Sequence, residues 1–211
     1  MFVHSYRTMG NIGSMLTVLR RMEQCNTHIY TIGISGASCS GKSWLANKIR
    51  SISPNTVTIL SMDSYYKNVE YINTLEYRHD NPEAIDYNQF LRDFSALRNG
   101  ESVSLPIYDY ERHKVVGHEQ IQAHSLLVVE GLFVFYDVRI RKLYDLKIWT
   151  EAPNEILFAR RMERDIRERG DTDTSARNRY YHDVVPAFDK FISELKANAD
   201  IIINTNIKVK S

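Results

Sequence analysis

The chain has 211 residues, of which 43% are hydrophobic and 25% are charged, and its formal net charge is +1. This length suits one domain with a modest insertion, and the composition is that of an ordinary folded protein. A net charge so close to zero gives no reason to expect nucleic acid or a membrane surface as a partner, and no apolar run approaches the roughly 20 residues of a membrane helix.

The N-terminal part of the chain differs from the rest in its charge. Residues 1–27 are basic and contain no acid before Glu23. We interpret them as a weakly ordered extension, with an organelle transit peptide as the alternative, and expect residues 28–211 to form the folded domain. Cys25 and Cys39 are the only cysteines, so no disulfide framework is expected and a reducing, cytoplasmic compartment is the default.

From residue 29 onward, short β-rich runs alternate with helical patterns. The candidate strands are continuously apolar, which is typical of parallel strands covered on both faces. They are IYTIGIS (29–35), TVTILSM (56–62), SLLVVEG (125–131), LKIWT (146–150) and ADIIIN (199–204). The fold class is therefore predicted to be α/β, with an open parallel sheet of about five strands flanked by helices.

Helices are expected between these strands, two of them opening with a proline and closing before a glycine. Their predicted ranges are 42–51, 82–99, 153–169 and 174–196. The last is expected to bend at Pro186. Residues 102–123, SVSLPIYDYERHKVVGHEQIQA, interrupt the alternation and are interpreted as a β-hairpin insertion.

The first strand and helix are joined by GASCSGKS (36–43), which fits the phosphate-binding pattern G-x-x-x-x-G-K-[ST] in its required context. Glycines there let backbone N–H groups point at phosphate oxygens, and the helix N-terminus adds positive charge. Lys42 is expected to reach the β- and γ-phosphates, and the Ser43 hydroxyl to hold Mg²⁺. The predicted nucleotide site comprises Gly36, Ala37, Ser38, Cys39, Ser40, Gly41, Lys42 and Ser43.

The loop does not name a reaction, but the rest of the chain narrows the choice. The D-x-x-G and N-K-x-D segments of a GTPase switch are absent, and the size suits a small-molecule kinase. Asp63 follows one expected strand and Glu130 ends another, so both lie at the carboxyl edge of the sheet, where ligands bind. Asp63 is a candidate general base and Glu130 a candidate Mg²⁺ carboxylate; a turn-forming aspartate and a structural ion pair are the alternatives.

The segment EILFARRMERDIRERG (155–170) is rich in arginine. It fits a solvated helical face with acidic partners at i,i+4, such as Glu163, Asp165 and Glu168. It equally fits a mobile lid over about 160–175 that brings cations onto a transferring phosphoryl group. The residues alone leave both interpretations open.

Taken in chain order, the glycine loop, SMDSYYK, HDNPEAID, LPIYDYERH, VVEGLF and RRMERDIRERG resemble the uridine–cytidine kinase branch of the phosphoribulokinase/uridine kinase family. The resemblance covers about residues 28–203. It implies a P-loop kinase fold, ATP or GTP as donor with Mg²⁺, and the 5′-hydroxyl of uridine or cytidine as acceptor in pyrimidine salvage. It implies small-molecule partners, with no nucleic acid or membrane, and leaves a homo-oligomer open.

The resemblance also implies roles for individual residues. Catalytic roles fall to Asp63 as base and to Lys42, Arg164 and Arg169 at the phosphates. Substrate-side positions are Tyr66, Asp80 at the ribose hydroxyls, Tyr108 and His113 at the pyrimidine, Arg161 and Arg179. The Mg²⁺ site is assigned to Ser43 and Glu130.

The chain departs from the family at three positions. Asp171 stands where the family commonly has arginine, Arg179 where it commonly has glutamine, and Trp44 is bulkier than usual. These departures keep open a kinase with another acceptor, such as nicotinamide riboside, pantothenate or a sugar phosphate. A nucleotide-binding regulator without transfer activity is the third reading, against which the intact Lys42 and Asp63 argue.

Overall fold

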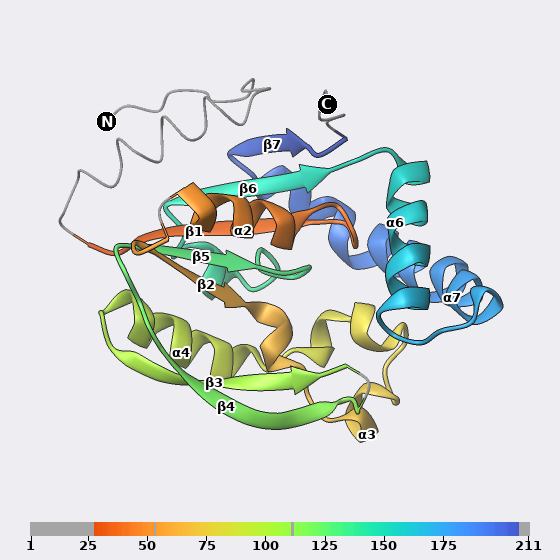
Figure 1. Cartoon of the computed structure of the whole chain (residues 1–211), viewed down its shortest axis with the longest axis horizontal. Coiled ribbons are helices and arrows are strands. Elements are labelled where there is room, and N and C mark those ends of the chain that lie inside the picture. The colour runs from red at the N-terminus through yellow and green to blue at the C-terminus, as the bar shows by residue number, and fades with distance from the viewer. Residues whose placement is uncertain (1–27, 53, 111, 207–211) are drawn as a thin grey trace.

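The computed structural model describes residues 28–52, 54–110 and 112–206 (Figure 1). The extension predicted for residues 1–27 lies outside the described residues.

Five parallel strands form the central sheet, in the order β2-β5-β1-β6-β7. Their bounds are β1 (Tyr30–Gly36), β2 (Val57–Ser61), β5 (Leu126–Glu130), β6 (Leu146–Glu151) and β7 (Ile201–Asn204). All five correspond to strands expected from the apolar runs, so the predicted α/β class and parallel sheet are confirmed.

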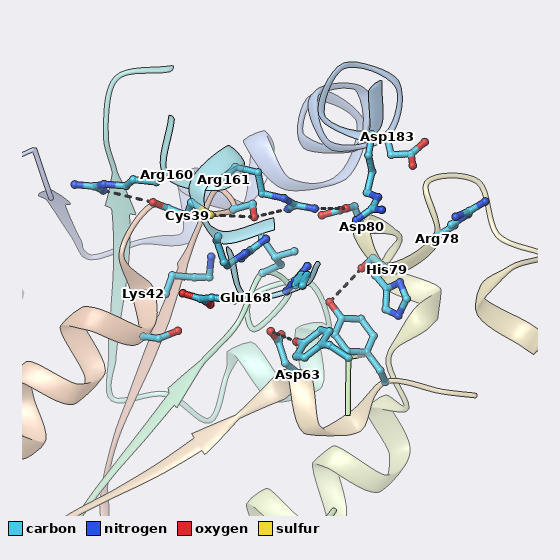
Figure 2. A pocket seen from close by; sticks show the side chains of 18 of the residues that line it. Cys39, Lys42, Asp63, Arg78, His79, Asp80, Arg160, Arg161, Glu168 and Asp183 are labelled. Carbon is cyan, nitrogen blue, oxygen red and sulfur yellow. Dashed lines mark hydrogen bonds and ion pairs between the residues drawn. The ribbon is translucent and has the colours of Figure 1, made fainter. Parts of the chain in front are cut away.

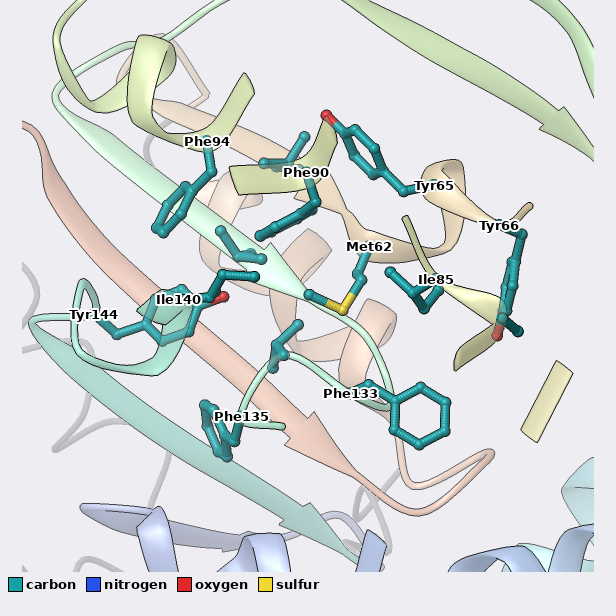
Figure 3. Close-up of a cluster of buried hydrophobic side chains, with 14 of the residues drawn as sticks. Met62, Tyr65, Tyr66, Ile85, Phe90, Phe94, Phe133, Phe135, Ile140 and Tyr144 are labelled. Carbon is teal, nitrogen blue, oxygen red and sulfur yellow. The ribbon is translucent and has the colours of Figure 1, made fainter. Parts of the chain in front are cut away.

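Each face of the sheet packs against a separate hydrophobic core. In β5, Leu127 and Val129 belong to a core shared with α4 (Tyr87–Arg98), whereas Leu126 and Val128 belong to one shared with α2 (Lys42–Ile52). Figure 3 shows the first core, where Met62 lies among aromatic rings such as Phe90 and Phe133. Because both faces are covered, the strands are apolar on both sides and their sequences do not alternate between apolar and polar residues.

The helix expected over 82–99 begins later than predicted. Pro82 opens a separate turn, η3 (Pro82–Ala84), and Ile85 is extended because it forms a β-bridge with Tyr66. Asp86 then caps α4, its side chain accepting a hydrogen bond from the Gln89 N–H. The cap defines the start of the helix because it satisfies one of the backbone N–H groups that have no partner within the first helical turn.

The described residues contain five further α-helices. They are α3 (Val69–Ile72), α5 (Val138–Arg141), α6 (Asn154–Arg167), α7 (Asp173–Arg179) and α8 (Val185–Ala187). The helix expected over 174–196 is a run of short segments, in which Pro186 lies between the π-helical turns η4 (Tyr180–Val184) and η5 (Phe188–Ile192). Because proline has no backbone N–H, it interrupts the hydrogen bonds of a regular α-helix, and the neighbouring turns are π-helical. The run ends in η6 (Ser193–Asn198).

Two strands stand outside the central sheet. β3 (Ser102–Asp109) and β4 (Lys114–Gln122) pair antiparallel, with an irregularity between Ile107 and Tyr108. The pair lies beside α4, on the β2 side of the sheet, and β3 contacts both α4 and η1 (Met62–Tyr65) (Figure 1). This contact places the end of β3 beside the turn that carries Asp63.

Candidate active site

A cavity of about 1670 Å³ lies at the carboxyl edge of the sheet, where Figure 1 shows α6 and α7 beyond the ends of the strands. Its walls include the glycine loop, η1, the turn η2 (Arg78–Asp80), the β3–β4 turn, the end of β5, and α6 with α7. We call the part at the glycine loop the donor end, and the part formed by the other segments around Asp80 the acceptor end.

The glycine loop joins β1 to α2 and is held from three sides. At Gly36, φ is 153°, and a Cβ atom would collide with the carbonyl oxygen of Thr150, so only glycine fits. The Ser40 hydroxyl lies 2.6 Å from the Thr150 hydroxyl, and Thr205 donates a hydrogen bond to the Ser40 carbonyl at 2.8 Å. Arg160 donates to the Cys39 carbonyl and to Thr205. The loop is therefore preformed.

Lys42 is buried at the floor of this loop (Figure 2). Its Nζ donates to the carbonyls of Gly36 at 3.2 Å and Ala37 at 2.8 Å. Burial lowers the pKa of Lys42, and the nearby charges of Glu130 and Asp63 oppose that shift. An anion bound here would add a partner that favours the charged lysine.

Glu130 lies between two hydroxyl groups at the end of β5. Its Oε2 accepts a hydrogen bond from Ser43 at 3.1 Å and its Oε1 one from Ser61 at 3.0 Å. Burial, followed by the charge of Asp63, raises the pKa of Glu130, while Lys42 opposes the shift. The described residues contain no cluster of three or more His, Cys, Asp or Glu able to hold a metal ion. Kinase Mg²⁺ sites commonly need only one or two carboxylates beside the phosphates, so Ser43 and Glu130 fit this ion.

Asp63 lies in η1, directly after β2, at the junction of the donor and acceptor ends. Its Oδ2 accepts a hydrogen bond of 2.6 Å from the Tyr110 hydroxyl. Burial, reinforced by Asp63, raises the pKa of Tyr110, so the phenol stays a donor. Tyr110 was not predicted from the sequence. The available signal was its place two residues after Tyr108 in the expected hairpin, where alternate residues would share a face; in the structure β3 ends at Asp109 and Tyr110 lies in the turn that follows.

Aromatic rings form one wall of the acceptor end. The ring of Tyr66 lies 5.0 Å from that of His79 and 5.5 Å from that of Tyr108. His79 Nε2 is 3.1 Å from the Tyr108 hydroxyl, and its ring is 5.1 Å from that of His113. The buried His113 Nδ1 has no hydrogen-bond partner among the described residues. This wall thus contains a buried polar atom without a partner.

His79 was also missed by the sequence analysis, although it precedes the predicted Asp80. Burial, followed by the charges of His113 and Arg169, lowers the pKa of His79 from 6.5 to about 4. The imidazole is therefore neutral near pH 7, and it adds a hydrogen-bonding group without a charge.

Three arginines converge on the buried carboxylate of Asp165. Arg161 Nε donates to it at 2.7 Å, Arg164 at 3.0 Å, and the Arg169 guanidinium lies 3.7 Å away. Burial alone would raise the pKa of Asp165, but the charge and hydrogen bond of Arg161, with the other two arginines, lower it overall. The sequence analysis named Asp165 only as one acidic partner among three.

Arg161 links the loop to the acceptor end, extending between the Cys39 side of the loop and Asp80 (Figure 2). It donates to the Ser38 hydroxyl at 2.6 Å, and its NH2 lies 3.9 Å from Asp80 Oδ2. Burial raises the pKa of Asp80, while Arg161 and its neighbours oppose the shift. A carboxylate held in this way is available to accept hydrogen bonds from a ligand.

The arginine-rich segment divides its side chains between solvent and the cavity, and the lid interpretation stays a prediction. Arg167 pairs with Glu163 at 2.7 Å on an exposed helical face, as an ordinary i,i+4 pair. Arg161, Arg164 and Arg169 line the cavity instead.

The predicted site residues come together around this one cavity. Those that form its wall are Ser38, Cys39, Gly41, Lys42, Ser43, Asp63, Tyr66, Asp80, His113, Glu130, Arg161, Arg164, Arg169 and Arg179. Three loop residues lie behind the cavity surface: the carbonyls of Gly36 and Ala37 accept from Lys42, and Ser40 contacts Thr150. Tyr108 contacts His79, which lines the cavity. No helix in the described ranges is long and apolar enough to cross a membrane.

Comparison with known proteins places these residues in context. The model of the Phosphoribulokinase / Uridine kinase family matches residues 31–210. Uridine kinase of Borrelia duttonii (strain Ly) is 39% identical over 176 residues, which cover 82% of this chain and 84% of that protein. Uridine-cytidine kinase A of Dictyostelium discoideum is 37% identical over 175 residues; the match covers 82% of this chain but only 35% of that longer protein.

Solved structures share the architecture. A protein described as a possible uridine kinase from Bacillus stearothermophilus has a TM-score of 0.64 at 17% identity, with 91% of this chain and 98% of that chain covered. Phosphoribulokinase from Rhodobacter spheroides has a TM-score of 0.61 at 18% identity, with 83% and 69% covered. At these identities the likeness shows the fold alone.

Proposed function

Because this chain belongs to the phosphoribulokinase/uridine kinase family, we propose that it transfers the γ-phosphoryl group of ATP or GTP to the 5′-hydroxyl of uridine or cytidine. The observation that carries the proposal is the single cavity that joins the glycine loop to Asp63, Asp80 and His113. The 39% identity to a uridine kinase of similar length supports the choice of acceptor.

At the donor end, the loop N–H groups and Lys42 hold the β- and γ-phosphates. Arg164 and Arg169 add charge from the opposite wall, where negative charge spreads in the transition state. Mg²⁺, held by Ser43 and Glu130, supplies further neutralisation of the phosphate oxygens when bound.

Asp63 is the general base. Tyr110 holds its Oδ2, which orients the carboxylate so that Oδ1 takes the proton of the attacking 5′-hydroxyl. The bond from the 5′-oxygen to the γ-phosphorus forms as the bond to the bridging oxygen of the donor breaks. The products are the nucleoside 5′-monophosphate and the nucleoside diphosphate.

At the acceptor end, Asp80 accepts hydrogen bonds from the ribose hydroxyls, and His113 Nδ1 reads the polar edge of the base. The two arginines assigned to the acceptor are already paired, Arg161 with Asp165 and Arg179 with Asp171. Such pairing favours an uncharged nucleoside over a sugar phosphate, whose phosphate would compete with these carboxylates.

The test is an assay of the purified chain with ATP, Mg²⁺ and single acceptors: uridine, cytidine, nicotinamide riboside, pantothenate and ribulose 5-phosphate. We expect ADP release that depends on uridine or cytidine, with the 5′-monophosphate identified by mass spectrometry. The Asp63→Asn variant supplies the background rate. Preference for another acceptor, or nucleoside binding without ADP release, would contradict the proposal.

A further inference from the structure

Asp171 and Arg179, which lie on either side of the start of α7, form an ion pair with each other. Arg179 NH1 lies 2.8 Å from Asp171 Oδ2, and NH2 lies 2.8 Å from Oδ1, so both ends of the guanidinium fork are engaged. The side chains are only 15% and 32% exposed, for Asp171 and Arg179 respectively, and both residues line the cavity. A two-fold, partly buried pair of this kind is stronger than an ordinary surface ion pair.

The pair closes the turn between α6 and α7, residues 168–172. On one side, the Asp171 N–H donates to the Asp165 carbonyl at 3.0 Å. On the other, the Thr172 side chain caps α7 by accepting from the Ser175 N–H. Arg179 stands at the end of α7, so its bond to Asp171 ties the last residue of that helix to the turn before it.

Arg169 lies in this turn and contacts the catalytic region. Its guanidinium lies 4.6 Å from the ring centre of Tyr110, whose hydroxyl donates to Asp63. A displacement of the turn would move Arg169 off that ring. The donor end has its own supports at Thr150 and Thr205, which do not involve the turn.

We propose that the Asp171–Arg179 pair fastens the α6–α7 turn over the acceptor end and so positions Arg169 against Tyr110. The inference rests on the proposed function for the identity of the acceptor. Arg179 is a positioning residue in this scheme, since both its terminal nitrogens are held by Asp171. Loss of the pair weakens acceptor use and, by displacing Arg169 from the phosphates, lowers kcat. Binding of ATP in the ground state is unaffected because the glycine loop is held separately.

The experiment is a double-mutant cycle of Asp171→Ala and Arg179→Ala, repeated with Asp171→Asn and Arg179→Gln should the alanine variants unfold. The readouts are KM for uridine, the dissociation constant for ATP, and hydrogen exchange of residues 168–179. The control cycle is Glu163→Ala with Arg167→Ala, an exposed pair on α6 outside the cavity wall, with a comparable contact of 2.7 Å.

We expect each single variant to raise KM for uridine roughly tenfold and to lower kcat in the same assays. The double variant should be no worse than either single variant, because the two residues act as a unit. Exchange in the turn should rise in all three variants, while the ATP dissociation constant and the control cycle stay unchanged. Additive effects, an unchanged KM, or unchanged exchange would overturn the proposal. If the parent does not phosphorylate uridine, the proposed function fails, but the exchange data still decide whether the pair fastens the turn.

Discussion

The donor and acceptor ends of the cavity are built in different ways. The donor end consists mainly of residues 36–43, one uninterrupted stretch between a strand and a helix. The acceptor end is assembled from η1, η2, the β3–β4 turn and the α6–α7 region, which are far apart in the sequence. A motif of backbone groups can hold phosphates in any member of a large class, whereas the choice of acceptor depends on side chains that several distant segments bring together.

This difference also shows in the charges. The donor end keeps a buried lysine beside Glu130, and the pKa of Glu130 is raised by burial and by the charge of Asp63. The acceptor end pairs its arginines with carboxylates and leaves neutral rings at the wall. Variants at the two ends should therefore separate catalysis, donor binding and acceptor recognition.

The largest effect is expected at the junction of the two ends. Asp63→Asn keeps the shape of the side chain but removes the proton acceptor, so kcat should fall by roughly 10²–10⁴. The ATP dissociation constant should change little, and Tyr110→Phe, which loses only the bond to Oδ2, should lose far less. Steady-state product assays measure kcat, and equilibrium binding measures the ATP dissociation constant. A variant with weakened ATP binding and normal turnover would place Asp63 at the donor end instead.

Lys42→Ala tests the donor end alone. Removal of the cation aimed at the phosphates should lower kcat by about 10²–10³, the usual effect of losing one group that stabilises transition-state charge. The free energy of unfolding should not fall, since burial of this lysine is itself unfavourable. Near-normal turnover in steady-state assays would rule out the phosphate role of the loop.

His113→Ala tests the acceptor end. Loss of the hydrogen bond to the base should lower kcat/KM for uridine by about 1–3 kcal/mol of transition-state binding, with ATP affinity retained. His118→Ala is the matched control, because His118 is exposed on β4 and lies outside the cavity wall. Equal activity of the His113 variant and the parent on uridine would remove the pyrimidine-reading role.

The neutral state of His79 predicts a pH effect on stability. As the pH falls below 6.5, the unfolded chain protonates this imidazole, whereas the folded protein resists protonation until about pH 4. The unfolded state then binds more protons, so the free energy of unfolding decreases from pH 6.5 to 4, by at most about 3 kcal/mol. Urea unfolding of His79→Phe should show a shallower decrease over this interval than the parent. Parallel curves would mean that His79 titrates normally.

The smallest effect concerns Trp44, which is 48% exposed at the donor end. The other tryptophan of the chain, Trp149, is buried in β6. ADP should therefore change the tryptophan fluorescence through Trp44, while uridine alone should not. Trp44→Phe should abolish the signal and cost the ADP affinity only about 0.5–1.5 kcal/mol. A uridine-induced change that survives in this variant would contradict the separation of the two ends.

Much of this arrangement follows from local sequence patterns. Continuous apolar runs marked all five parallel strands, and eight consecutive residues marked the phosphate-binding loop. The positions of Asp63 and Glu130 after their strands were enough to place both at one edge. Strand burial, the loop and the sheet edge depend on short-range periodicity and on a rule common to parallel sheets, so the sequence alone determined them.

Other features were decided by the tertiary structure. The start of α4 depends on the bridge between Tyr66 and Ile85, and no helical pattern contains that pairing. Three side-chain contacts of the site follow no recognisable sequence motif. They are the hydrogen bond from Tyr110 to Asp63, the contact of His79 with Tyr108, and the ion pair of Asp171 with Arg179. Each is a side-chain contact that exists only after separate elements have packed, and packing depends on the shape of the whole core rather than on any local motif.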